Sequence, residues 1–246
     1  MEINENERID DLQYKGLKII QDNTGFCFGI DSILLVDFAK KIKSGSTVID
    51  LGTGTGILGI LLCGKTNLKH VIGIEIQKEV ANMAERSIKL NSLEDKFEII
   101  NDDIKNIIEK RIIQKNTVDV VITNPPYKEI GNGIINENKK KLISRHETKA
   151  NLEDFIKVSA DILKDKGIIY MVHKPERLVD IIYLMRKNKI EPKKIKFIYP
   201  TKEKESNLVL IKAIKGANKF LKIDKPLYIY DSNGNYTEQI KQIYCE

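Results

Sequence analysis

The sequence predicts an α/β fold in which seven strands form a doubly wound, mostly parallel sheet, with an antiparallel strand near the C-terminus. Three observations support this prediction. Short apolar runs alternate with segments of helical periodicity between residues 46 and 188. The first of these runs ends in a glycine-rich turn, and two later apolar runs follow each other with no helix between them. Strands that are separated by helices form parallel sheets covered on both faces.

The composition is that of a globular protein. Of the 246 residues, 41% are hydrophobic and 31% are charged, which excludes a disordered or collagen-like chain. No run approaches the roughly 18 apolar residues that a membrane span needs. The polar, acidic start predicts neither a secretory signal nor a transit peptide, so we expect a cytoplasmic protein with no membrane partner. The three cysteines and three histidines are scattered along the sequence, so we expect no metal site. We also expect the protein to be a monomer.

Residues 1–43 are expected to form an N-terminal extension made of a hairpin and a helix, and residues 44–246 the main domain. Apolar and polar residues alternate between residues 14 and 29, which predicts a hairpin with its turn at residues 22–25. Asp31 then precedes an apolar run and is predicted to N-cap the helix.

The main domain is predicted to alternate strands and helices. Strands are expected at 46–52, 70–75, 97–101, 118–124 and 167–173, and helices at 55–64, 78–91, 152–163 and about 175–188. The last two strands, 195–200 and 207–214, are expected to be antiparallel neighbours. Residues 128–150 have little periodicity, and a loop of that length in a compact domain is typically functional or disordered.

The segment VIDLGTGTG, residues 48–56, predicts a strand, a glycine-rich turn and the start of a helix. Glycines let the backbone approach a ligand closely, and the helix N-terminus offers free N–H groups to it. We therefore assign five residues of this segment to a cofactor site: Asp50, Gly52, Thr53, Gly54 and Gly56. The glycines also match the dinucleotide fingerprint GxGxxG, so a nicotinamide-dependent dehydrogenase is an alternative.

Acidic residues follow the next two strands. Glu75 ends the second strand of the main domain, where a carboxylate can accept hydrogen bonds from ribose hydroxyls, and Ile76 is placed to flank an adenine ring. After the third strand, we assign Asp103 and Ile104 to the cofactor's adenine. Asp102 is the alternative acid, or a helix N-cap.

The motif Asn124-Pro125-Pro126-Tyr127 follows the fourth strand and predicts the catalytic site. Two prolines fix the backbone and hold Asn124 in one place. The asparagine and proline carbonyls are two acceptors, and the tyrosine adds a flat face. This set suits a planar nitrogen that carries two hydrogens, such as an exocyclic amine or an amide. Asn124 is also assigned to the cofactor site.

Together these motifs resemble the class I S-adenosylmethionine-dependent methyltransferases that methylate amino groups, which have a Rossmann-like fold. The flanks resemble one subfamily, the tRNA1(Val) (adenine-N6)-methyltransferases, at ERIDDL (7–12), GFCFGID (25–31), SRHE (144–147) and the tyrosine-rich ending (228–237). The resemblance implies S-adenosylmethionine as cofactor, tRNA as partner and methyl transfer to N6 of an adenine beside the anticodon. One position departs, since the residue before Asp103 is usually glycine and here is Asp102.

Two related methyltransferases remain alternatives, one acting on a release-factor glutamine N5 and one on an rRNA guanine N2. The short N-terminal segment favours the tRNA enzyme. Charge agrees, because residues 128–246 carry 25 basic against 16 acidic residues, whereas residues 1–127 carry 16 against 19. Such asymmetry hints at a polyanionic partner, although a lysine-rich surface alone would also produce it. We assign the basic residues after the NPPY motif to RNA phosphates: Lys128, Lys139, Lys140, Lys141 and Arg145.

Overall fold

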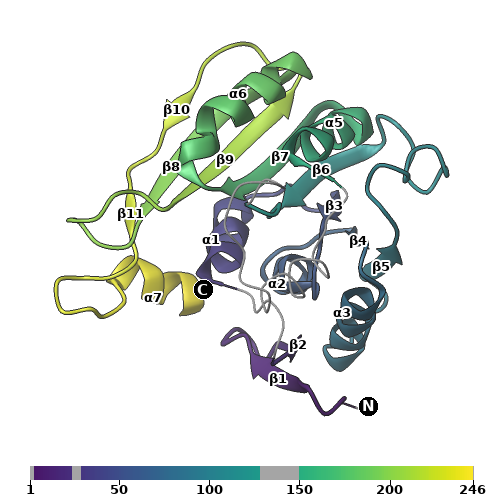
Figure 1. Ribbon diagram of the computed structural model, residues 1–246, viewed down its shortest axis with the longest axis horizontal. Coiled ribbons are helices and arrows are strands. Elements are labelled where there is room, and N and C mark those ends of the chain that lie inside the picture. The colour runs from purple at the N-terminus through teal and green to yellow at the C-terminus, as the bar shows by residue number, and fades with distance from the viewer. Residues whose placement is uncertain (1–2, 24–28, 128–149, 246) are drawn as a thin grey trace, which may run out of the picture.

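The computed structural model describes residues 3–23, 29–127 and 150–245. A doubly wound sheet runs through the molecule (Figure 1), and its seven main strands lie in the order β8-β9-β7-β6-β3-β4-β5. Their bounds are Thr47–Leu51 (β3), His70–Glu75 (β4), Phe97–Asn101 (β5), Val118–Thr123 (β6), Leu163–His173 (β7), Ile190–Tyr199 (β8) and Leu208–Lys215 (β9). Two short strands, Lys222–Ile223 (β10) and Leu227–Tyr228 (β11), extend the edge beside β8. The predicted mixed α/β fold is confirmed.

Helices cover both faces of the sheet, as the alternation of strands and helices predicts. The helices are Ile30–Ala39 (α1), Ile57–Lys65 (α2), Lys78–Leu90 (α3), Leu152–Ile162 (α5), Leu178–Lys187 (α6) and Glu238–Cys245 (α7), with a 3-10 turn at Pro175–Arg177. One core cluster contains apolar residues of α1, α2 and α7, and the other contains those of α5 and α6. Along β3, Val48 belongs to the first cluster and Ile49 to the second, because successive side chains of a strand point to opposite faces.

The two late strands form an antiparallel pair, as predicted. The strand β9 is antiparallel to both β7 and β8, whereas β3, β4, β5, β6 and β7 pair in parallel. Both β7 and β8 start several residues earlier than expected, and Leu163, expected on a helix face, is the first residue of β7. The helix α7 was not expected from the sequence. In the part of the chain that the structure describes, no helix is both long and apolar enough to span a membrane.

The N-terminal hairpin that the structure describes turns earlier than predicted, and residues 24–28, which include part of the predicted turn and its second arm, lie outside the described residues. Its strands are Glu7–Asp11 (β1) and Lys18–Asp22 (β2), and the connection between them is the turn at residues 12–17. Leu12 N–H donates to the Leu17 carbonyl across this turn at 2.9 Å, and Gly16 has a φ of 72°, which glycine adopts without strain. The polar segment of residues 7–11 is therefore a strand, although its composition did not predict one.

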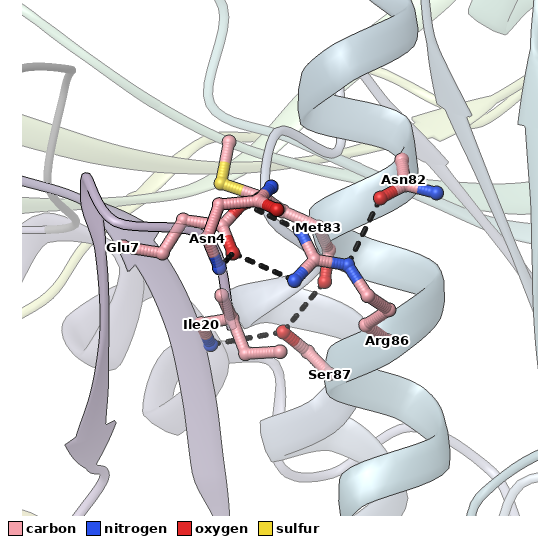
Figure 2. A network of polar contacts seen from close by, with 7 residues as sticks. All are labelled: Asn4, Glu7, Ile20, Asn82, Met83, Arg86 and Ser87. Atoms are coloured by element: carbon pink, nitrogen blue, oxygen red, sulfur yellow. Dashed lines mark hydrogen bonds and ion pairs between the residues drawn. The ribbon is translucent and has the colours of Figure 1, made fainter. Parts of the chain in front are cut away.

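Polar contacts to α3 explain why that segment is held as a strand (Figure 2). Arg86 of α3 forms a bidentate pair with the Glu7 carboxylate, with N···O distances of 2.7 and 2.5 Å. The Ile20 N–H donates to Ser87 Oγ at 2.9 Å, and that hydroxyl donates to the Met83 carbonyl. Arg86 lowers the pKa of Glu7 to about 2, so the pair stays ionised at neutral pH. The hairpin is thus anchored by charge and by its edge hydrogen bonds.

Candidate active site

The candidate site lies at the carboxyl edge of the sheet, around the point where the strand order reverses. In the sheet β3 lies between β4 and β6, so the chain winds in opposite directions from it. Leu51 at the end of β3 pairs with Ile74 of β4 and with Thr123 of β6. The residues that follow these three strand ends therefore meet at one edge, which is where doubly wound sheets bind ligands.

The glycine-rich turn after β3 is held by its neighbours on both sides. The N–H groups of Gly52 and Thr53 both donate to the Ile74 carbonyl at 3.0 Å. Gly54 and Gly56 have φ values of 59° and 88°, a left-handed conformation that residues with a side chain adopt at a cost. Gly59 has another role, because a Cβ there would lie 2.3 Å from the Phe97 ring. The third glycine of the fingerprint thus allows α2 to pack closely on the sheet.

Glu75 connects the tip of β4 to this turn. It is only 5% exposed. One carboxylate oxygen accepts the Gly54 N–H at 3.0 Å, and the other accepts the Gln77 N–H at 2.9 Å. Burial raises the pKa of Glu75, with the backbone hydrogen bonds opposing that shift. Each carboxylate oxygen has a further lone pair that a ligand can use.

Asp50 is fully buried beneath the turn. Its Oδ2 accepts a hydrogen bond of 2.6 Å from the Thr53 hydroxyl, whereas its Oδ1 has no hydrogen-bond partner among the described residues. Burial raises the pKa of Asp50 to about 7, and the nearby Glu75 charge adds to the shift. A buried acceptor without a partner is costly, so a cationic or N–H-bearing ligand group would relieve it.

A cleft opens beside these residues. Its lining combines the predicted Gly52, Glu75, Ile76, Asp103 and Ile104 with three residues that were not assigned to the site, Ile74, Ala150 and Phe155. Phe155 was expected only on the buried face of a helix, and helical periodicity carries no signal that would separate a core aromatic from a cleft wall. The cleft thereby brings together residues from the ends of β3, β4 and β5 and from α5.

The structure distinguishes the two adjacent aspartates. Asp102 forms an ion pair with Lys110 at 2.7 Å and accepts the Asp103 N–H. Asp103 lines the cleft, and its Oδ1 accepts the Lys105 N–H at 3.0 Å. The segment after them forms turns rather than an α-helix, so Asp102 caps no helix. Asp103 is therefore the better placed acid for a ligand in this cleft.

The Asn124-Pro125-Pro126-Tyr127 segment is bound by a residue that sequence reasoning assigned elsewhere. Asp31 Oδ2 accepts hydrogen bonds from Asn124 Nδ2 at 3.1 Å and from the Tyr127 hydroxyl at 2.7 Å. The prediction that Asp31 is the N-cap of α1 is wrong. Gly29 occupies that position, and Asp31 lies in the first turn of the helix. The spacing of 93 residues between Asp31 and Asn124 explains why no local pattern could have shown this contact.

The Tyr127 ring packs against the end of β7. Its centroid lies 5.2 Å from that of His173 in an edge arrangement, and Lys174 Nζ lies 5.4 Å from it. Burial lowers the pKa of His173 to about 4, so this ring is neutral at physiological pH. Sequence reasoning did not assign either residue to the site. Of the predicted RNA contacts, all five, from Lys128 to Arg145, lie outside the described residues.

Comparisons with known proteins decide the family. A family model described as the methyltransferase small domain matches residues 28–187. The chain belongs to this methyltransferase family. The resemblance predicted from the motifs is thereby confirmed, and the dehydrogenase alternative is wrong.

The methyltransferase is similar to curated proteins and solved structures along most of its length. A tRNA1(Val) (adenine(37)-N6)-methyltransferase of Tolumonas auensis is 27% identical over 80% of each chain. An enzyme of the same name from Flavobacterium johnsoniae is 20% identical over 95% of this chain and 99% of its own. The crystal structure of a predicted O-methyltransferase from Agrobacterium tumefaciens superposes with a TM-score of 0.70 at 21% identity, covering 87% of this chain and 95% of its own, which supports the fold.

Proposed function

We propose that this methyltransferase transfers a methyl group to the exocyclic N6 of an adenine in tRNA, at the position beside the anticodon. The observation that carries the proposal is the Asn124 amide, which is held at the tip of β6 next to the glycine-rich turn. The substrate is drawn from the two bacterial relatives, because both are named for this reaction.

S-adenosylmethionine is the cofactor that the family implies, and the described residues fit it. The partnerless Oδ1 of Asp50, beneath the Gly52–Gly56 turn, suits the cationic amino group of the cofactor. Glu75 would accept from the ribose hydroxyls. Asp103 would accept a hydrogen bond from the amino group of the cofactor's adenine, which would lie between Ile76 and Ile104 in the same cleft. When bound, the cofactor supplies an electrophilic methyl group.

The residues of the protein would then have to position and activate the adenine amino group, which is a poor nucleophile. The lone pair of an adenine amino group is delocalised into the ring, and two acceptors on its N–H groups favour a more pyramidal nitrogen. Asn124 Oδ1 and the Pro125 carbonyl would be these acceptors, and Pro126 stiffens the backbone that carries them. Their bonds strengthen as positive charge develops on the nitrogen, which stabilises the transition state selectively. The methylated nitrogen loses a proton readily, so no strong general base is required.

Tyr127 would hold the adenine after it leaves the stack of bases. The Asp31 carboxylate anchors its hydroxyl, and His173 packs against its ring. A ring fixed at two points offers a stacking face at little cost in conformational entropy. This arrangement suits a flat base better than a flexible glutamine side chain.

Charge supports a nucleic-acid substrate. Residues 186–225 carry 13 basic against 4 acidic residues, and the strand β8 within them ends at the same edge of the sheet as β6. We further propose that Lys128, Lys139, Lys140, Lys141 and Arg145 contact tRNA phosphates. An enzyme with this substrate would act in the cytoplasm, where tRNA is modified.

The test is mass spectrometry of nucleosides from unmodified tRNA incubated with the protein and isotope-labelled S-adenosylmethionine. We expect labelled N6-methyladenosine, which disappears when the adenine beside the anticodon is replaced by guanine in the transcript. Asn124→Ala serves as the control for contaminating activity, with an expected loss of about 10²–10³ in rate and unchanged cofactor binding. Label in N2-methylguanosine, or in a release-factor glutamine offered in parallel, would reject the proposal.

A further inference from the structure

We infer that Asp31 is a positioning residue that determines which side of the Asn124 amide faces the substrate. Asp31 is 8% exposed and reaches the NPPY motif from α1, on a distant part of the chain. A single oxygen, Oδ2, accepts from both Asn124 Nδ2 and the Tyr127 hydroxyl. The inference rests on the proposed function in one respect, because it takes the methyl acceptor to be an amino group.

The chemistry of the two side chains fixes the orientation. A carboxylate accepts hydrogen bonds but donates none, so the nitrogen of the Asn124 amide must be the atom that faces Asp31. The amide oxygen is then the atom left to meet the substrate. If the amide rotated by half a turn, its NH2 group would face the NH2 group of the base, and two donors cannot bond each other. Asp31 therefore selects the productive orientation.

The second oxygen of Asp31 makes a substitution predictable. Its Oδ1 accepts the Ser32 N–H at 2.9 Å. In Asp31→Asn, an NH2 group facing the Ser32 N–H would set two donors against each other, so the new amide places its oxygen there and its NH2 group toward Asn124. Asn124 must then rotate to present its own oxygen to this NH2 group, which turns its nitrogen toward the substrate. Asp31→Asn inverts the Asn124 amide, whereas Asp31→Ala only releases it.

This reasoning predicts an unusual order of activities. At saturating tRNA and cofactor, we expect kcat to fall about 100-fold in Asp31→Asn but about 10-fold in Asp31→Ala, with KM for tRNA within about threefold of wild type. A residue that only supports the fold would give the opposite order, because alanine leaves a cavity and unpaired donors whereas asparagine is isosteric. Asp37→Asn, which removes a charge from the same helix, is the matched control and should match wild type.

A double-mutant cycle tests whether Asp31 acts through Asn124. In an Asn124→Ala background, both Asp31 substitutions should change kcat by less than about threefold, because the group they orient is gone. Losses that add in full would overturn the inference. The reverse order of the two single variants would do so as well.

A measurement without turnover separates this inference from the proposed function. The side-chain amide signal of Asn124, identified by its absence in Asn124→Ala, should exchange slowly with solvent in the wild-type protein and fast in Asp31→Ala. Equal exchange rates would reject the positioning role. If the labelled product proves to be a methylated glutamine or guanine, the adenine substrate fails, but the order of the Asp31 variants still decides the positioning role.

Discussion

Replacing Glu75 by glutamine should weaken cofactor binding, and it also removes one hydrogen bond inside the protein. The carboxylate is buried, and its two oxygens accept the Gly54 and Gln77 N–H groups. The glutamine amide has a single oxygen and can accept only one of these N–H groups, while its NH2 group faces the other. The charge available to the ribose hydroxyls disappears as well.

The expected size follows from the bonds concerned. A hydrogen bond to a charged group contributes about 1.5–3 kcal/mol, so losing one raises the Kd for S-adenosylmethionine about 10- to 150-fold. Glutamine is preferable to alanine here, since alanine would also leave a cavity under the turn. The exposed Glu79, in the first turn of α3, provides the matched control, Glu79→Gln.

Isothermal titration calorimetry with S-adenosylmethionine measures the effect, and thermal unfolding of the apo proteins checks the fold. A Kd for S-adenosylmethionine within about twofold of wild type in Glu75→Gln would refute the ribose contact. Equal weakening in Glu79→Gln would attribute the effect to long-range charge instead.

Three further predictions concern charge. Cofactor affinity should rise by up to about fivefold between pH 6 and pH 7 and about tenfold in all by pH 8, because burial raises the pKa of Asp50 to about 7 and a cationic ligand binds its ionised form; calorimetry across this range should give a flat profile for Asp50→Asn. Glu7→Gln should lower the free energy of unfolding by about 1.5–3 kcal/mol at pH 7, in urea titrations. The Glu7 pKa is lowered to about 2, so its contribution is complete above pH 4.5 and declines as the pH falls toward 2, and a difference that stays constant down to pH 3 would contradict the pairing. Replacing Lys139, Lys140 and Lys141 by glutamine should flatten the salt dependence of tRNA binding without changing cofactor affinity; identical salt slopes for wild type and the triple variant would remove these residues from the RNA contact.

The sequence alone determined the order and direction of the main elements. Residues 46–101 carry apolar strands, a glycine turn and helices at regular spacing, and these are local patterns that depend on the two periodicities of strand and helix. The same local patterns predicted that Glu75 and Asn124 lie at one edge of the sheet, because each follows a strand and parallel strands end on the same side. The antiparallel pairing of β8 and β9 was predicted because no helix separates these two strands in the sequence.

The tertiary structure alone decided which of these residues interact and how. It showed that Asp102 pairs with Lys110 and leaves Asp103 in the cleft, a difference of one position that a strand-end pattern cannot resolve. It moved the hairpin turn to residues 12–17, because β1 is held by Arg86 far along the chain rather than by its own composition. It assigned Asp31 to the Asn124 amide in the same way. These contacts join side chains distant in sequence, and their geometry exists only after the helices have packed on the sheet.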